Sequence, residues 1–413
     1  MTLDLVVRHA RIAGRGADTF DIGIAGGKIA DIAPSIATEA PEEEAGGRLV
    51  TPGFVETHIH LDKSCILDRC RLEQGSLQEA IAQVAAAKRG FTEDDVYRRG
   101  RRTLENAIVH GTTRMRTHVE VDPRIGLKSF DAVRRLKRDY AWAIDLEICV
   151  FPQEGLLNDP GAEELLIEAC KKGADLIGGC PYTDSDPHGQ IARIFEIARR
   201  FDCDIDFHLD FDIDASRMNL DEVCRQTEAH RFGGRVAVGH VTKLSAVPPE
   251  QLAAIARRLA GAGVAVTVLP ATDLFLMGRE HDHNVPRGVA PVHKLAAHGV
   301  TCSLATNNVL NPFTPFGDCS LVRMANLYAN VAQAGTPDDL SVCFDLITSQ
   351  PARLMNLRDY GIAVGNPADL IVLDCGDAAM AVAEVSPPLL GIKRGRRSFA
   401  REAPRLFRPA REK

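Results

Sequence analysis

The chain has 413 residues, of which 45% are hydrophobic and 25% are charged. That length suits one large enzyme domain with an appendage, or two to three average domains, and the composition excludes a mainly disordered protein. The 49 Lys and Arg against 56 Asp and Glu leave a formal charge of −7. This balance provides no general attraction to nucleic acid or to an anionic membrane, so we expect neither as a partner.

The cysteines and the first residues indicate where the protein works. Eleven cysteines are scattered without a Cys-x-x-Cys pair, which suits reduced core residues better than a disulfide framework or a cysteine zinc site. The opening MTLDLVVRHARIAG lacks a basic start, a long apolar core and a small-residue cleavage site, and no apolar run is long enough to cross a bilayer. We therefore expect a soluble, cytoplasmic protein.

Short β-runs open and close the chain. The segments LDLVVRHARIA and DIGIAGGKIADIAP alternate apolar and polar residues, with the Gly26–Gly27 pair as the turn between two strands. Near the other end, GIAVGNPADLIVLD carries a turn followed by an apolar strand, and GIKRGRRSFA can pair as an edge strand. We expect residues 1–51 plus 360–413 to form one small composite β-sandwich domain.

The middle of the chain, residues 52–359, alternates short apolar runs with amphipathic stretches. Several of the helical patterns end at a glycine, as helices commonly do. Eight β-then-α units over about 300 residues predict a (β/α)8 TIM barrel as the catalytic domain. A doubly wound open sheet is the alternative, but no phosphate-binding glycine motif follows any strand. The expected barrel strands are 55–62, 113–122, 145–153, 175–181, 204–210, 235–241, 264–271 and 301–308.

Five histidines fall where a barrel places its chemistry, at the C-terminal ends of strands. His58 and His60 alternate on the first strand, so both point into the barrel, where two imidazoles can hold one divalent metal. His118, His208 and His240 end the second, fifth and sixth strands. A lone His-x-His is a weak signal, but the combination predicts a metal site more strongly than a set of satisfied core histidines.

A family resemblance runs over nearly the whole chain. The strings TPGFVETHIHLDKS, RTHVEVD, FPQEG, FHLD, GHVTK, NPFTPFGD and MNLRDYGIAVGNPADLIVL resemble, in the same order, the amidohydrolase superfamily. Within it they are similar to the cytosine deaminase branch, which includes N-isopropylammelide amidohydrolase. The resemblance implies His58, His60 and His208 as metal ligands, His240 as a catalytic partner and Gln153 as a group that orients the substrate ring.

The same resemblance implies one metal ion, zinc or iron(II). The fourth strand, in DLIGGCP, has no lysine to supply the carbamylated bridge found in binuclear relatives. A divalent ion suits chemistry in which a water molecule attacks a ring carbon.

Two positions depart from the family pattern. The strand-eight aspartate of the branch falls on Asn307, and the glutamate that follows strand five falls on Phe211. An asparagine carbonyl can ligate weakly but cannot take a proton, and a phenyl ring cannot donate one. Losing one positioned acid or base typically costs about 10²–10⁴-fold in rate.

These departures leave three explanations open. Asn307 is an engineered substitution that traps substrate, or the enzyme works without the pair and moves protons through Asp210 or His240. In the third, the reaction has changed, to a lyase or isomerase step, or the protein is a catalytically silent binder.

The remaining candidates concern the substrate. Phe211 and Phe313 lie at or just after strand ends and suit a flat heteroaromatic ring. Lys63 can pair with an acidic group of the substrate or neutralise Asp62, and His118 is expected as a neighbour beside the site.

The function that we expect is hydrolysis of a C–N bond on a nitrogen heterocycle. In a deaminase or aminohydrolase of this kind, water attacks a ring carbon that bears an amino or alkylamino group, or a cyclic amide, and ammonia or an amine leaves. The partner is a small heterocyclic molecule. We interpret the basic tail KRGRRSFAREAPRLFRPAREK as a solvated end or a subunit contact in a homo-oligomer.

Overall fold

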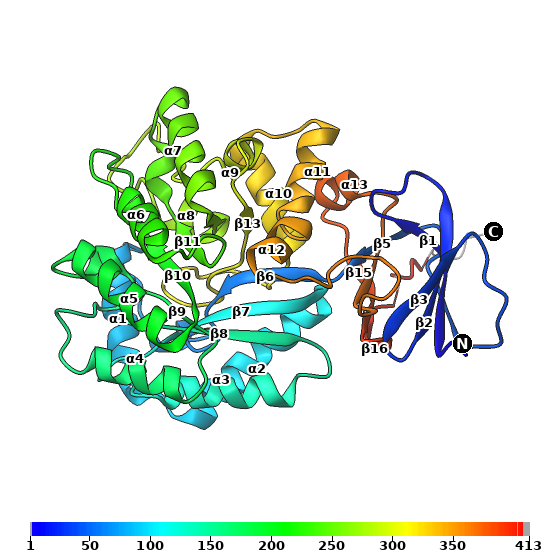
Figure 1. The fold of residues 1–413 in the computed structure, drawn as a ribbon, viewed down its shortest axis with the longest axis horizontal. Helices are drawn as coiled ribbons and strands as arrows, with labels where there is room; N and C mark the ends of the chain where they lie inside the picture. Colours follow the sequence, from blue (N-terminus) through cyan, green and yellow to red (C-terminus); the bar gives the residue numbers. More distant parts are fainter. Residues whose placement is uncertain (1, 403, 408–413) are drawn as a thin grey trace, which may run out of the picture.

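The structure, a computed structural model, describes residues 2–402 and 404–407 (Figure 1). It consists of a barrel surrounded by helices and, beside it, a separate sheet built from both ends of the chain. The expected TIM barrel and a separate β-sheet formed by both termini are confirmed. Within the described part of the chain, every helix is too short or too polar to span a bilayer.

Eight parallel strands form the barrel, in the order in which they occur in the sequence. The backbone of Asn307 closes the ring between the last and the first strand. Its N–H donates to the carbonyl of His58 at 2.8 Å, and its carbonyl accepts from the N–H of His60 at 2.8 Å. The strands are β6 (Phe54–Ile59), β7 (Thr112–Glu120), β8 (Asp145–Phe151), β9 (Leu176–Ile177), β10 (Asp204–Leu209), β11 (Val236–His240), β12 (Val264–Val268) and β13 (Cys302–Leu304).

The fourth barrel strand is shorter than the expected 175–181. Strand-type pairing nevertheless continues past β9, because the N–H of Gly178 donates to Val150 and the carbonyl of Gly179 accepts from His208. A Cβ at Gly178 would lie 2.3 Å from the carbonyl oxygen of Asp206. Glycine at this position therefore permits the close approach of β9 to β10.

Helices cover the outside of the barrel, with their apolar faces packed on the strands. Side-chain caps define several helix starts, since Ser76, Thr92 and Ser320 each accept a hydrogen bond from the N–H three residues later. The helices are α1 (Leu77–Ala87), α2 (Glu93–Val109), α3 (Lys128–Asp139), α4 (Ala162–Lys171), α5 (Pro187–Phe201), α6 (Leu220–His230), α7 (Pro249–Ala262), α8 (Pro270–Leu276), α9 (Val292–Ala297), α10 (Leu321–Ala332), α11 (Pro337–Asp345) and α12 (Ser349–Leu354).

The terminal sheet interleaves the two ends of the chain. Its main strand order is β16-β15-β14-β5-β1-β2-β3, with β4 paired to β1, so that β5 lies between an N-terminal and a C-terminal strand. A separate core of side chains, including Val7, Ile24 and Leu370, packs on it. The strands are β1 (Leu5–Ile12), β2 (Thr19–Ala25), β3 (Lys28–Ala33), β4 (Glu42–Glu44), β5 (Leu49–Pro52), β14 (Leu370–Leu373), β15 (Pro388–Lys393) and β16 (Arg396–Ala400), and helix α13 (Ala378–Ala383) lies between β14 and β15.

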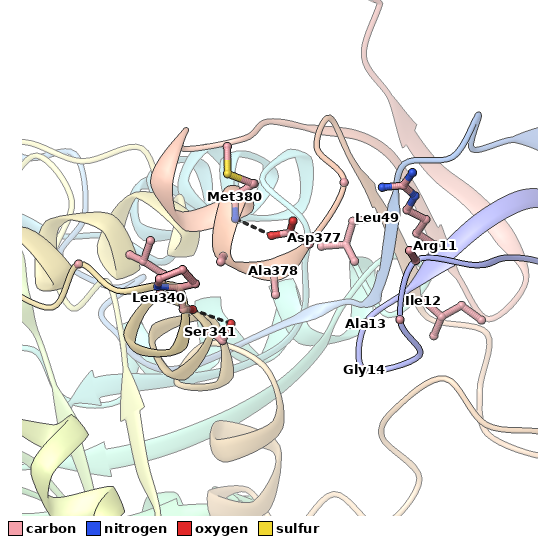
Figure 2. Close-up of a pocket in the computed structure, with 16 residues that line it drawn as sticks. Arg11, Ile12, Ala13, Gly14, Leu49, Leu340, Ser341, Asp377, Ala378 and Met380 are labelled. Atoms are coloured by element: carbon pink, nitrogen blue, oxygen red, sulfur yellow. Dashed lines mark hydrogen bonds between the residues drawn. The ribbon is translucent and has the colours of Figure 1, made fainter.

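A cavity of about 620 Å³ lies where this sheet meets the barrel helices (Figure 2). The turn after β1, Leu340 of α11 and the start of α13 line it. None of the candidate site residues named above contributes to this cavity. The size of this cavity therefore does not indicate where the active site lies.

Candidate active site

Four of the predicted histidines meet at the C-terminal end of the barrel. His58 comes from β6 and His60 directly follows it, His208 comes from β10 and His240 from the end of β11, and all four are buried. The Nε2 atom of His208 lies 3.1 Å from Nε2 of His58 and 3.2 Å from Nε2 of His60. A ring nitrogen of His240 lies within 4.8 Å of ring nitrogens of His58 and His208.

The backbone around this cluster is strained and tightly packed. Asp210, His240, Val241 and Asn307, at or just after the ends of barrel strands, have positive φ angles between 43° and 72°. Such conformations persist where the surrounding structure enforces them, and they concentrate at functional sites. A Cβ at Gly239 would lie 3.1 Å from the ring of His58, so a side chain there would push against the cluster.

The spacing of His208 to both His58 and His60 fits imidazoles that share a divalent metal ion, and His58, His208 and His240 also lie close enough together to hold one. Hydrogen bonding alone does not explain these contacts, because His208 Nε2 carries at most one hydrogen and has a nitrogen close to it on two sides. Two nitrogens that each bind one zinc at about 2.0–2.1 Å in a tetrahedral arrangement lie roughly 3.3 Å apart, which is close to the 3.1 Å and 3.2 Å that separate His208 Nε2 from those of His58 and His60. Burial, reinforced by the neighbouring cationic or imidazole groups, lowers the pKa of His58, His60 and His208 well below the usual range. They therefore stay in the neutral form that a metal requires.

Asn307 adds one more polar atom to this group. Its side chain is buried, and its Oδ1 atom has no hydrogen-bond partner among the described residues. A buried carbonyl oxygen without a partner is costly unless a ligand or water satisfies it. The residue lines the same small cavity as His60 and His208, so its amide oxygen is available to a cation held there.

His118 packs behind the cluster. Its ring stacks on that of His58, with centroids 3.7 Å apart and planes 22° from parallel. Its Nε2 lies 3.6 Å from a carboxylate oxygen of Asp206, whose other oxygen accepts from the Arg116 guanidinium at 2.9 Å. Because Arg116 already neutralises Asp206, the group His58, His118 and Asp206 is a weaker cation site than the three converging imidazoles.

His240 has a carboxylate partner that the sequence patterns did not single out. Its Nδ1 atom lies 2.7 Å from Oδ1 of Asp273, in α8, and both side chains are buried. Burial raises the pKa of Asp273, and His240 offsets part of that rise. The ring of Phe211 lies against that of His240 with centroids 3.7 Å apart.

Lys63 and Gln153 form the polar side of the cavity. Lys63 Nζ donates to Oε1 of Gln153 at 3.2 Å and pairs with Glu120 at 2.7 Å. It also lies 4.4 Å from the centroid of the Phe313 ring, in cation–π range. The Asp62 carboxylate accepts instead from the backbone N–H groups of Lys63 and Glu120. Glu120 is therefore the ion-pair partner of Lys63.

A second lysine extends this polar network away from the cavity. Lys88 Nζ contacts carboxylate oxygens of Glu120, Asp122 and Glu154 at 2.5–2.8 Å. Burial alone would raise the pKa of Glu120, but Lys63 and Lys88 hold it to about 2. The three carboxylates lie close enough to hold a cation, and the Lys88 ammonium occupies that position.

Most of the predicted site residues share one small cavity, while three lie outside its wall. His58 and His118 pack behind the wall. Asp210 accepts hydrogen bonds from the N–H groups of Asn219 and Leu220, at the start of α6, so its carboxylate is engaged in holding that helix. The cavity is lined by His60, Lys63, Gln153, Tyr182, His208, Phe211, His240, Thr272, Asn307, Asn308 and Phe313.

The patterns missed Tyr182, Thr272 and Asn308 in the wall and Asp273 behind it. Thr272 and Asp273 follow the strand expected at 264–271, and Asn308 ends the strand expected at 301–308. Their positions at or just after the C-terminal ends of expected barrel strands could have identified them as candidate site residues. Tyr182 lies in a short 3-10 turn after β9 and directly follows the strand expected at 175–181, so the same signal was available for it.

Comparison with known proteins agrees with this arrangement. Residues 42–133 and 130–399 match the amidohydrolase family, and the chain belongs to that family. It is 29% identical over 403 residues to N-isopropylammelide isopropyl amidohydrolase of Pseudomonas sp. (strain ADP), covering 95% of this chain and 96% of the relative. It is 30% identical over 377 residues to pterin deaminase of Rhizobium rhizogenes, covering 89% and 85%.

A solved structure extends the similarity to the whole fold. The crystal structure of 5-methylcytosine deaminase from Klebsiella pneumoniae with 5-fluorocytosine superposes with a TM-score of 0.93 at 28% identity. The superposition covers 98% of this chain and 99% of that one. The chain therefore resembles these relatives over both the barrel and the terminal sheet.

Proposed function

We propose that the protein is a metal-dependent hydrolase that cleaves a C–N bond on a nitrogen heterocycle and releases ammonia or an amine. The close approach of His208 Nε2 to the Nε2 atoms of both His58 and His60, all three rings being buried and neutral, carries the proposal. Names of the relatives support the substrate class, since they include an N-isopropylammelide amidohydrolase, a pterin deaminase and a 5-methylcytosine deaminase.

In this proposal one divalent ion, zinc or iron(II), is held by His58, His60 and His208, with the amide oxygen of Asn307 as a further, weaker donor. When bound, such an ion lowers the pKa of a water molecule and polarises the ring carbon that is attacked. Neutral imidazoles leave most of the ion's charge uncompensated, which strengthens that effect. A single ion is proposed because the second histidine group contains an aspartate that Arg116 neutralises.

The substrate ring is proposed to lie against Phe211 and Phe313, in a cavity of about 10 Å³ that must widen to admit it. Lys63 and Gln153 supply hydrogen bonds to its oxo or ring-nitrogen groups, because both polar side chains line the cavity. His240 is the proposed catalytic partner of the attacking water. Asp210 and His118, at the edge of the site, act by holding the backbone and the His58 ring.

A lyase or isomerase step and a silent binder are not favoured, because the similar proteins named above are hydrolases and deaminases. The absence of both family carboxylates, at positions 307 and 211, makes the proton path differ from the usual pattern rather than removing the reaction. The explanation that Asn307 is an engineered substitution that traps substrate is not favoured either, because it does not account for Phe211.

The test is metal analysis together with a substrate screen. Purified protein loaded with zinc or iron(II) is assayed for ammonia or amine release from amino-substituted pyrimidines, triazines and pterins. We expect about one ion per chain and turnover of at least one ring class. His298→Ala, at an exposed position, serves as the matched control for His208→Ala. The proposal would be overturned if both the purified and the reconstituted protein held less than one equivalent of metal per chain.

Finer features are proposed with it. We propose the domain division 1–51 plus 360–413 against 52–359, a cytoplasmic location and a homo-oligomer. All eleven cysteines are free, which suits a reducing compartment. Trp142 is 59% exposed, and an exposed tryptophan suits a contact between subunits. Light scattering of the full chain decides the oligomeric state.

A further inference from the structure

We infer that Asp273 is the positioning residue that makes His240 the proton acceptor of the reaction, in place of the carboxylates missing at 307 and 211. The inference rests on the proposed function. It starts from the hydrogen bond of 2.7 Å between His240 Nδ1 and Asp273 Oδ1. Both side chains are at most 2% exposed, so water does not compete for this bond.

Asp273 is itself held in one orientation. Its second carboxylate oxygen accepts from the backbone N–H of Leu269 at 3.1 Å, across the first turn of α8. The carboxylate accepts hydrogen bonds and has none to donate while ionised. The nitrogen of His240 that faces it must therefore be the protonated one, as in other histidines whose tautomer is set by a carboxylate.

That tautomer leaves Nε2 of His240 with a free lone pair. Among the described residues, no hydrogen bond other than the one to Asp273 reaches the His240 ring, and His240 lines the cavity together with His60 and His208. The Phe211 ring covers one face of the imidazole. The basic nitrogen is thus presented to the cavity, where an attacking water would lie.

The other groups in the wall are unsuited to this task. The amide of Asn307 and the ring of Phe211 cannot accept a proton at neutral pH. Lys63 is already paired with Glu120, and His60 and His208 are proposed to bind the ion. His240 is the remaining side chain in the described wall that combines a free basic nitrogen with a carboxylate partner.

The proton balance of the reaction then closes. The water oxygen forms a bond to the ring carbon, and one water proton passes to Nε2 of His240, giving an imidazolium that Asp273 stabilises. The C–N bond breaks as this proton moves to the leaving nitrogen, which departs as ammonia or an amine. His240 returns to its neutral form, and no oxidant or further reactant is required.

The direct test uses Asp273→Asn, which keeps the shape of the side chain and removes its charge. We expect kcat to fall by about 10²–10⁴-fold, with KM within threefold and metal content unchanged. Asp282→Asn, on a side chain that is 94% exposed, is the matched control and should retain full activity. Asp273→Asn with kcat within threefold of the unaltered protein would overturn the inference.

A second readout does not depend on activity. Ring ¹⁵N resonances of histidine-labelled protein, with His240 assigned from His240→Gln, should show a protonated Nδ1 and a bare Nε2. In Asp273→Asn this fixed tautomer should be lost. A protonated Nε2 in the unaltered protein would contradict the inference. If no ring substrate is turned over but the tautomer depends on Asp273, the proposed function fails while the positioning by Asp273 stands.

Discussion

The backbone N–H of Asn307 donates a 2.8 Å hydrogen bond to the carbonyl of His58. This contact closes the barrel and also fixes the neutral amide of residue 307 beside the histidine cluster. Residue 307, where the family resemblance places an aspartate, therefore takes part in closing the barrel, but its side chain carries no charge.

Asn307→Asp should therefore tighten metal binding. A carboxylate beside the ion adds an opposite charge in a buried site, and both Asn and Asp tolerate the positive φ of 63°. We expect the metal dissociation constant to fall at least about tenfold, or 1.4 kcal/mol, as measured by competition with a chelator. Asn356→Asp, at an exposed position with a φ of 56°, is the control. Unchanged or weaker binding in Asn307→Asp would show that residue 307 does not face the ion.

Lys63→Met should weaken substrate binding without unfolding the protein. Glu120 keeps Lys88 as a partner, so the loss of Lys63 does not leave its carboxylate unpaired. We expect KM for the ring substrate identified in the screen to rise about tenfold, since one charge-assisted hydrogen bond is worth roughly 1.5–3 kcal/mol. Steady-state kinetics provides the measurement, with the exposed Lys172→Met as control. A KM within twofold of the original value would remove Lys63 from the binding site.

Lys88→Met, in contrast, should destabilise the fold. It leaves the carboxylates of Asp122 and Glu154 without the ammonium that they share. Removing one member of a buried charge network costs about 3–5 kcal/mol. Denaturant unfolding of the metal-free protein measures this loss in the free energy of unfolding. The control Lys171→Met, at an exposed position, should change the free energy of unfolding by less than about 0.5 kcal/mol. A change as small as this in Lys88→Met would contradict a stabilising role of the Lys88 charge network.

Asp95 should contribute stability that depends on pH. Hydrogen bonds from Arg69, aided by Arg99, lower the pKa of Asp95 to about 2. A carboxyl group whose pKa is depressed by folding stabilises the protein above its unfolded pKa, near 4, and loses that contribution as the pH falls toward 2. The difference in unfolding free energy between the unaltered protein and Asp95→Asn should shrink between pH 6 and pH 3. A difference that stays constant over this range would refute the assignment.

The architecture and the histidine cluster could be predicted from the sequence because both depend on local patterns. Alternation on one strand places His58 and His60 on the same face, and strand ends locate His208 and His240. The barrel-strand order follows from the repetition of β-then-α units. These features need no knowledge of which distant residues touch.

The partners of these residues could not be predicted in the same way. Asp273 lies 33 positions from His240, and Glu120 lies 57 positions from Lys63. Such pairings depend on register and loop shape, which no single segment determines. The strand β9 is also shorter than expected, and Gly178, directly after it, depends on a distant partner, the backbone of Asp206, for its close packing.

The central claim, a metal ion bound by His58, His60 and His208, is tested most directly by metal stoichiometry. Mass spectrometry of metal content after dialysis should find about one zinc or iron per chain in the unaltered protein and in exposed His298→Ala. His208→Ala should retain less than a tenth of an equivalent and release no ammonia or amine. A His208→Ala protein that keeps a full equivalent of metal would contradict the account.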